Sequence, residues 1–326
     1  LALGALALWA SMPAGANDSA AAIGQGGLQL VQQGDVAMLS EDLYVSVPKI
    51  RVKYEFRNEG AVPVKTLVAF PLPEYDLSDI EGNVGWPSDN QTDPTGFKVW
   101  VDGVTVKPRL EAKAFVGSRD VTKDLAAAGI PVVYPFGNYW DRLNKVKRAD
   151  IDKLAKAGIV EVFPDTKEVQ PKWTIKSAHY WDMTFLPGKV VVVEHDYAPV
   201  NGGSFWSEGM IKTEAQAAKD EFFRDFCLDQ STLDGIARKL AADKARKADG
   251  SAMLSYIDVR YILKTGRNWK GPIGKFKLTV DKGSPANLVS FCADGVTKTG
   301  PSTFVVEKTN WEPDRDLSVL ILQSMQ

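Results

Sequence analysis

The residues from 49 to 73 constrain the fold of this chain more than any other segment. Apolar side chains at Ile50, Val52, Tyr54 and Phe56 alternate with charged residues along KIRVKYEFR. Successive side chains of a β-strand point to opposite faces, so this alternation predicts a strand with one buried face and one solvated face.

A second apolar run, residues 64–70, follows the turn formers Asn58, Glu59 and Gly60 and ends before Pro71. Gly and Asn favour turns, and Pro interrupts strand pairing. We therefore predict that residues 49–73 form a hairpin on the wall of a β-sandwich.

The first residues are typical of a secretory signal. An uncharged apolar run, residues 1–12, is followed by Pro13 and by the small residues Ala14-Gly15-Ala16. Such a segment before a small-residue site is what a signal peptidase recognises. We expect residues 1–16 to be a signal peptide, truncated at its start, and the mature protein to be periplasmic or secreted; a short buried helix is the alternative.

The charge balance argues against one class of partner. Acidic and basic residues number 41 and 39, which gives a net charge of -2. A protein that binds nucleic acid neutralises phosphates with an excess of basic residues, and this chain has none. We expect no nucleic acid partner, and beyond residue 16 no apolar run approaches the ~18 residues of a membrane span.

The chain has two cysteines, Cys227 and Cys292, which are 65 positions apart. Two cysteines in an oxidising compartment most simply form one disulfide. Two free buried thiols are the alternative. Neither cysteine lies in a C-x-x-C pair or beside a His or Lys that would lower its pKa, so a catalytic role is less expected.

Further patterns divide the rest of the chain. Asp102-Gly103 separates two alternating runs, which predicts a tight hairpin. The similar stretches DLAAAGIP and KLAKAGIV each predict a short helix that ends at a glycine, Gly129 and Gly158. The intervening residues around Trp140 and Leu143 predict another helical turn.

These elements predict a mainly β protein with helical insertions, in which two antiparallel β-sandwich-like domains are joined by a helical segment. We expect an N-terminal sandwich over residues 17–210 with a helical insertion at 118–160. A helical linker at 211–249 and a C-terminal sandwich at 250–326 complete the chain. The length exceeds what one hydrophobic core usually serves.

The order of many short matches resembles a known family. They are NDSAA, GGL, MLSEDLYVS, IRVKYEFRNEG, VAFPLP, FKVWVDG, GIP, the CLD at Cys227, TGRNWKGPIGKFKLTVD and WEPDRDLSVLIL. Together they resemble the exported bacterial family catalogued as domain of unknown function 4424, over almost the whole mature chain. The resemblance implies a periplasmic two-part β protein and supplies no catalytic residues.

Three aromatic residues are the predicted ligand-binding candidates. Trp100 falls on the charged side of its predicted strand, and Tyr139 and Trp140 fall in the helical insertion. Aromatic faces can stack on sugars or cover a hydrophobic ligand, although most large aromatics are core residues.

A pair of carboxylates provides an enzymatic alternative. Glu194 and Asp196 are two apart on a predicted strand, so both point to one face about 7 Å apart. This spacing is compatible with a glycosidase acid/base pair and equally with a solvated strand face. His179 and His195 are the only histidines. If the two cysteines form a disulfide, too few nitrogen and sulfur ligands remain for a zinc site.

We therefore expect a non-catalytic periplasmic binding or scaffolding protein without a metal or other cofactor. Its partner would be an envelope protein or glycan of unknown identity, and its oligomeric state is not predicted. The alternatives are a glycan-acting hydrolase that uses Glu194 and Asp196, and a carrier of a hydrophobic small molecule.

Overall fold

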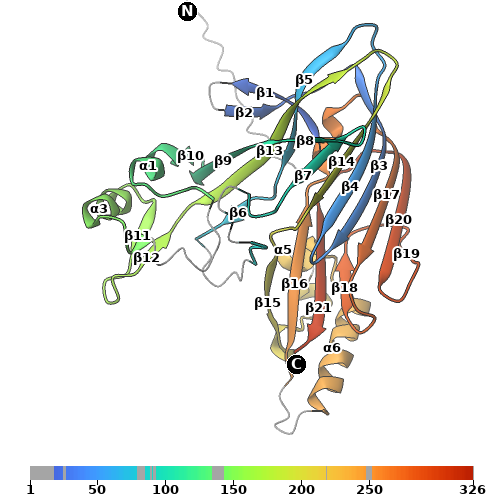
Figure 1. Ribbon diagram of the computed structural model, residues 1–326. Coiled ribbons are helices and arrows are strands. Elements are labelled where there is room, and N and C mark those ends of the chain that lie inside the picture. The colour runs from blue at the N-terminus through green and yellow to red at the C-terminus, as the bar shows by residue number, and fades with distance from the viewer. Residues whose placement is uncertain are drawn as a thin grey trace, which may run out of the picture.

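The computed structural model describes residues 18–24, 27–78, 85–88, 90, 93–133, 143–217, 219–246 and 252–325. Within them the chain is mainly β, as the sequence predicts, with α-helices at two places and a further 3₁₀ helix at Lys264–Asn268 (Figure 1). The predicted signal peptide, residues 1–16, lies outside the described residues.

The largest sheet has eight strands and contains residues from both halves of the chain. In spatial order its strands are β19 Thr297–Lys298, β20 Thr303–Trp311, β17 Ile273–Asp281, β3 Val36–Ser46, β4 Ile50–Asn58, β14 Val190–Tyr197, β7 Lys98–Val101 and β8 Val104–Val106. The Asp102-Gly103 hairpin is confirmed, because β7 pairs with β8 across it.

Two smaller sheets share a core with this large sheet. The seven-stranded sheet contains β10 Arg119–Asp120, β9 Arg109–Val116, β13 Thr174–Phe185, β5 Val64–Pro71, β1 Ser19–Gly24, β2 Gly27–Leu30 and, beside β13, β6 Tyr75–Asp76. The four-stranded sheet contains β15 Gly202–Trp206, β16 Leu254–Tyr261, β21 Leu317–Ser324 and β18 Leu288–Phe291. Figure 1 shows β5 and β13 near the upper part of the large sheet and β16, β21 and β18 beside its lower part.

The predicted hairpin over residues 49–73 is wrong, although its first strand is confirmed. β4 alternates between buried and more exposed residues. It pairs with β3 and β14, whereas β5 pairs with β13 and β1 in a different sheet. The turn after β4 therefore crosses from one layer to the other. Asn58 holds this crossing, because its buried amide donates to the carbonyl oxygens of Val62 and Phe185 at 2.8 and 2.9 Å.

The predicted division into two sandwiches is not confirmed. β17, from the C-terminal region, pairs in parallel with β3, from the N-terminal region, with Leu278 opposite Leu43. The strands β16 and β21 enter the four-stranded sheet, so residues 250–326 are shared between two sheets. The physical reason is that an alternating strand with one apolar face can pair with any edge that buries that face, and the edge of β3 does so.

The predicted helical linker contains α4 Glu214–Ala217, α5 Glu221–Asp225 and α6 Gln230–Lys244, after a 3₁₀ turn at Glu208–Met210. Phe223, Leu233 and Ile236 of these helices form a core with Leu320 and Leu322 of β21. This segment therefore covers the four-stranded sheet, and a linker between two domains is not confirmed.

The helical insertion has its own small core. α1 Thr122–Ala127 and α3 Arg148–Lys156 pack with a two-stranded ribbon, β11 Val160–Val162 and β12 Val169–Pro171. Gly129 and Gly158 follow the helices with φ angles of 71° and 68°, which confirms the predicted glycine ends. Figure 1 shows this unit projecting from the ends of β9 and β13. The helical turn predicted around Trp140 falls largely on residues 134–142, outside the described residues.

The predicted disulfide is confirmed: Cys227 and Cys292 are bonded, with their Cα atoms 5.1 Å apart. It ties the segment between α5 and α6 to the end of β18. Among the described residues, none of the helices has the length and apolar character needed to cross a membrane.

Candidate functional site

A large groove lies where the eight-stranded sheet and the four-stranded sheet meet. It has a volume of about 860 Å³ and lies between β17 and β20 of the large sheet and β18 and β21 of the four-stranded sheet. We call it the sandwich groove. Its volume falls within the range of roughly 300–1,000 Å³ that is usual for small-molecule sites.

Alternating residues of facing strands give the groove an apolar floor. Phe276 and Leu278 of β17 are buried, as is Val306 of β20, which pairs with Leu278. The apolar lining residues are Leu263, Phe276, Leu278, Val289, Phe291, Ala293, Val296, Phe304, Val306, Trp311 and Leu317. Trp311 packs on Phe276 with ring centroids 4.4 Å apart.

The disulfide and the start of α6 form one wall. Cys227, Cys292 and Asp229 all line the groove. Asp229 accepts from the backbone N–H of Thr232 at 2.8 Å and so caps α6. The Thr232 hydrogen bonds to this carboxylate hold the pKa of Asp229 below its usual value. This wall is therefore fixed by a covalent bond and a helix cap.

Of the two basic residues that line the groove, Lys308 and Arg315, Lys308 lies on a strand, β20. It is half-buried, shares the inner face of β20 with Phe304 and Val306, and pairs with Phe276 across the sheet. Among the described residues, no carboxylate lies within 4 Å of its ammonium group.

The acidic residues of the groove are at its margin. Asp316 accepts from the N–H groups of Leu263 and Lys264 at 3.1 Å and pairs with the Lys264 ammonium at 3.5 Å. The remaining acids are exposed, as is Arg315; they are Asp294, Glu312 and Asp314. Their charges are solvated, and charges of that kind interact weakly.

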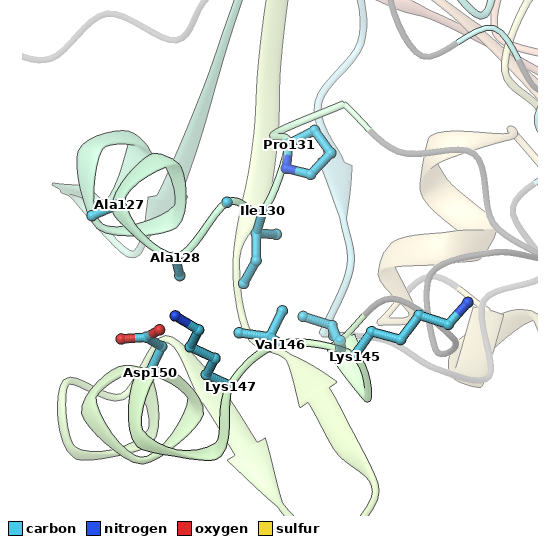
Figure 2. A pocket seen from close by; sticks show the side chains of 10 residues that line it. Ala127, Ala128, Ile130, Pro131, Lys145, Val146, Lys147 and Asp150 are labelled. Atoms are coloured by element: carbon cyan, nitrogen blue, oxygen red, sulfur yellow. The ribbon is translucent and has the colours of Figure 1, made fainter.

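A second pocket, of about 510 Å³, lies in the helical insertion. Figure 2 shows Ile130 and Val146 facing one another across it, with Lys147 and Asp150 at one side. Its walls, at residues 127–131 and 143–147, flank a stretch that is not described.

The predicted aromatic candidates are not brought together within the described residues. Trp100 of β7 is half-exposed and pairs with Glu194 of β14, on the face opposite to the buried Val99. It does not line the sandwich groove or the pocket of the helical insertion. Tyr139 and Trp140 belong to residues 134–142, which are not described.

The two carboxylates of the enzymatic alternative do share one face, as the spacing predicts. Glu194 and Asp196 are half-buried on β14, which is an internal strand of the large sheet. Asp196 pairs with the Lys49 ammonium at 2.6 Å. Neither carboxylate lines the sandwich groove or the pocket of the helical insertion.

A buried polar pair that the sequence analysis missed joins β1 to the large sheet. The Asp18 carboxylate Oδ1 lies 2.9 Å from His195 Nε2, and both side chains are 0% exposed. The Asp18 carbonyl accepts from Trp269 Nε1 at 2.5 Å. Burial raises the pKa of Asp18, and the attraction of His195 opposes this rise.

Aromatic rings enclose this pair: Phe70, Phe97 and Trp181 each lie between 5.1 and 5.2 Å from His195, measured between ring centroids. The pair lines neither the sandwich groove nor the pocket of about 510 Å³ in the helical insertion. It joins the residue before β1 to β14 of the large sheet. The sequence did indicate that His195 is buried. It alternates along β14 in step with the apolar residues Val191, Val193 and Tyr197 and so lies on the same strand face.

His179, the other histidine, is stacked on Phe97 with ring centroids 4.2 Å apart. Burial lowers the pKa of His179 to about 4, and Asp93 opposes this shift only in part. The unfolded chain therefore binds a proton between pH 6.5 and pH 4 that the folded protein does not bind.

It follows that stability should decrease as the pH falls through this interval, by about 3 kcal/mol at pH 4 from His179 alone. Urea unfolding at pH 7 and pH 4 measures this loss. The variant His179→Phe should show a smaller loss, because its side chain does not titrate. An equal loss in both proteins would mean that His179 does not contribute.

Metal chemistry finds no support in the described part of the chain. No group of three or more His, Cys, Asp or Glu side chains is close enough there to hold a metal ion.

The residue that sequence reasoning missed in the groove is Lys308. The pattern of Phe304, Val306 and Lys308 on one strand face could have placed Lys308 on the inner face. The strand β18 belongs to a different sheet from β20, so its position beside Lys308 cannot be inferred from local periodicity.

Comparison with known proteins adds a family. No curated protein matches the chain. A crystal structure of a "putative nutrient binding protein" from Legionella pneumophila subsp. pneumophila str. Philadelphia 1 aligns with a TM-score of 0.45 and 16% identity, over 94% of this chain and 70% of that chain. The model of the family described as Domain of unknown function (DUF4424) matches residues 16–320. The resemblance found in the sequence is thus confirmed over nearly the whole chain, and the protein belongs to the DUF4424 family.

Proposed function

We propose that the protein is a non-catalytic binding protein of the bacterial envelope that holds an apolar small molecule in the sandwich groove. The observation that carries this proposal is the groove itself, with about 860 Å³ of volume over an apolar floor. Of the functions considered from the sequence, it corresponds to a binding protein that acts as a carrier of a hydrophobic ligand.

Two features support an envelope location. The segment at residues 1–16 has the pattern of a signal peptide. The Cys227–Cys292 disulfide is of a kind that persists in oxidising compartments such as the periplasm.

The groove suits a small ligand better than an added β-strand. The outer edge of β20 is partly covered by β19, and Asn310 interrupts the strand with a φ of 48°. Lys308 also places a charge on the inner face of β20, close to this edge of the sheet. Short edges, irregularities and inward charges are features that prevent strand addition.

The hydrolase alternative is the weaker reading. Glu194 and Asp196 lie on the face of an internal strand and line neither the sandwich groove nor the pocket of the helical insertion. Glycosidases surround the scissile bond with their carboxylates, and that arrangement requires a cleft.

The test first identifies the bound molecule and then blocks the groove by a substitution. Native mass spectrometry of protein purified from its host should detect a co-purifying apolar molecule. Val289→Trp adds a large side chain to the half-buried wall of the groove on β18 and should abolish retention of this molecule.

Val104→Trp is the matched control, because Val104 is 67% exposed on β8, outside the groove. It should retain the molecule. Loss of retention in both variants, or undiminished retention in a folded Val289→Trp variant, would place the ligand elsewhere and contradict the proposal.

A further inference from the structure

The inference concerns Lys308 and rests on the proposed function. The sandwich groove is apolar on its floor, yet it contains a half-buried ammonium group. Lys308 lies directly across the sheet from Phe276, and it lines the same groove as Trp311. A cation beside apolar side chains loses part of its hydration, and it recovers that free energy only when it meets an anion.

The protein does not supply this anion within its described residues. The ion pairs found there include Lys264 with Asp316 at the groove margin, but none that involves Lys308. The other margin acids are exposed. The groove thus offers one inward positive charge at the side of an apolar floor.

We infer that the sandwich groove binds a long-chain carboxylate. The acyl chain lies on Phe276, Leu278 and Val306, and the carboxylate accepts hydrogen bonds from Lys308 Nζ. A hydrogen bond between a cation and a carboxylate is stronger than one between neutral groups, and it is strongest where water is partly excluded.

The other lysines of this sheet region do not share these surroundings. Lys275 and Lys277 of β17 are exposed, and they alternate with the buried Phe276 and Leu278. They lie on the opposite face of the same strand and do not line the groove. Lys275 is therefore a matched control for Lys308.

The experiment compares three ligands that share a dodecyl chain and differ in the head group: dodecanoate, dodecanol and dodecyltrimethylammonium. Binding to the full chain is measured by isothermal titration calorimetry at pH 7. We expect dodecanoate to bind about tenfold more tightly than dodecanol or better, and the cationic ligand to bind most weakly.

Substitution then locates the head group. Lys308→Met should remove the preference for dodecanoate and leave the affinity for dodecanol unchanged. Lys308→Arg should keep the preference, because it keeps the charge. Lys275→Met should bind all three ligands as the unchanged protein does, and thermal unfolding establishes that each variant is folded.

The outcomes separate this inference from the proposed function. Equal affinity for the three ligands would overturn the role of Lys308 and leave an apolar groove that ignores the head group. Tighter binding of the cationic ligand would also overturn it, and would assign head-group recognition to the marginal acids. Binding of none of the three would overturn both the inference and the proposed function.

Discussion

The variant Asp18→Ala is expected to lower the free energy of unfolding by about 3–5 kcal/mol. The substitution leaves His195 fully buried and without the carboxylate that lies 2.9 Å from its Nε2 atom. Removing one member of a buried pair costs more than the pair itself contributes, because the remaining polar group has neither water nor a partner. Urea unfolding at pH 7 measures the change.

Two further variants test whether the loss of stability comes from breaking the buried pair. Asp18→Asn retains the size of the side chain and one hydrogen-bonding oxygen, so it should cost less than Asp18→Ala. Asp42→Ala removes an exposed carboxylate from β3 and should change stability by less than about 0.5 kcal/mol. If Asp18→Ala costs no more than Asp42→Ala, the buried pair does not hold β1 in place.

Removal of the disulfide should have an effect of similar size. The variant with both Cys227→Ala and Cys292→Ala is expected to lose about 4 kcal/mol, because an unfolded chain no longer closed over 65 residues gains conformational entropy. Urea unfolding of this variant and of the oxidised protein measures the difference.

The native arrangement around the disulfide should persist in this variant. The Ser290 hydroxyl donates to the Phe226 carbonyl at 2.7 Å, so β18 remains attached to the end of α5. We therefore expect a folded protein with lower stability. Fully reduced protein that keeps its cysteines should match the variant, and a loss below about 1 kcal/mol in both would show that the unfolded chain is already restricted in that region.

The local sequence pattern predicts the structure correctly wherever the feature lies within a single strand or turn. The alternation at Ile50 to Phe56 correctly predicts the buried face of β4. Asp102-Gly103 correctly predicts the β7–β8 hairpin, and Gly129 and Gly158 correctly predict the ends of α1 and α3. In each case the signal and the structure that it produces lie within a few residues of one another.

The local sequence pattern does not predict which strands pair with one another. The run at residues 64–70 is a strand, as predicted, but β5 pairs with β13 instead of β4. Alternation of apolar and polar residues along a strand shows which face is buried, but it does not show which neighbouring strand or sheet covers that face. The same reason explains why β17 could be recognised as a strand and yet its parallel pairing with β3 could not.

The candidate site depends entirely on such long-range pairing. The sequence pointed to Trp100, Tyr139 and Trp140, which are aromatic residues in polar surroundings. The sandwich groove is instead built from β17, β18, β20 and β21, none of which has a local motif for binding.

The sequence by itself determined that the chain is mainly β, that it belongs with the DUF4424 family, and that its two cysteines can join. These follow from composition, short-range alternation and the pairing of the only two thiols. Only the tertiary structure decided that β4 and β5 separate into different layers, that Asp18 meets His195, and that Lys308 faces an apolar groove. Each of those contacts joins residues far apart in the chain, and its free energy depends on which surfaces the whole fold removes from water.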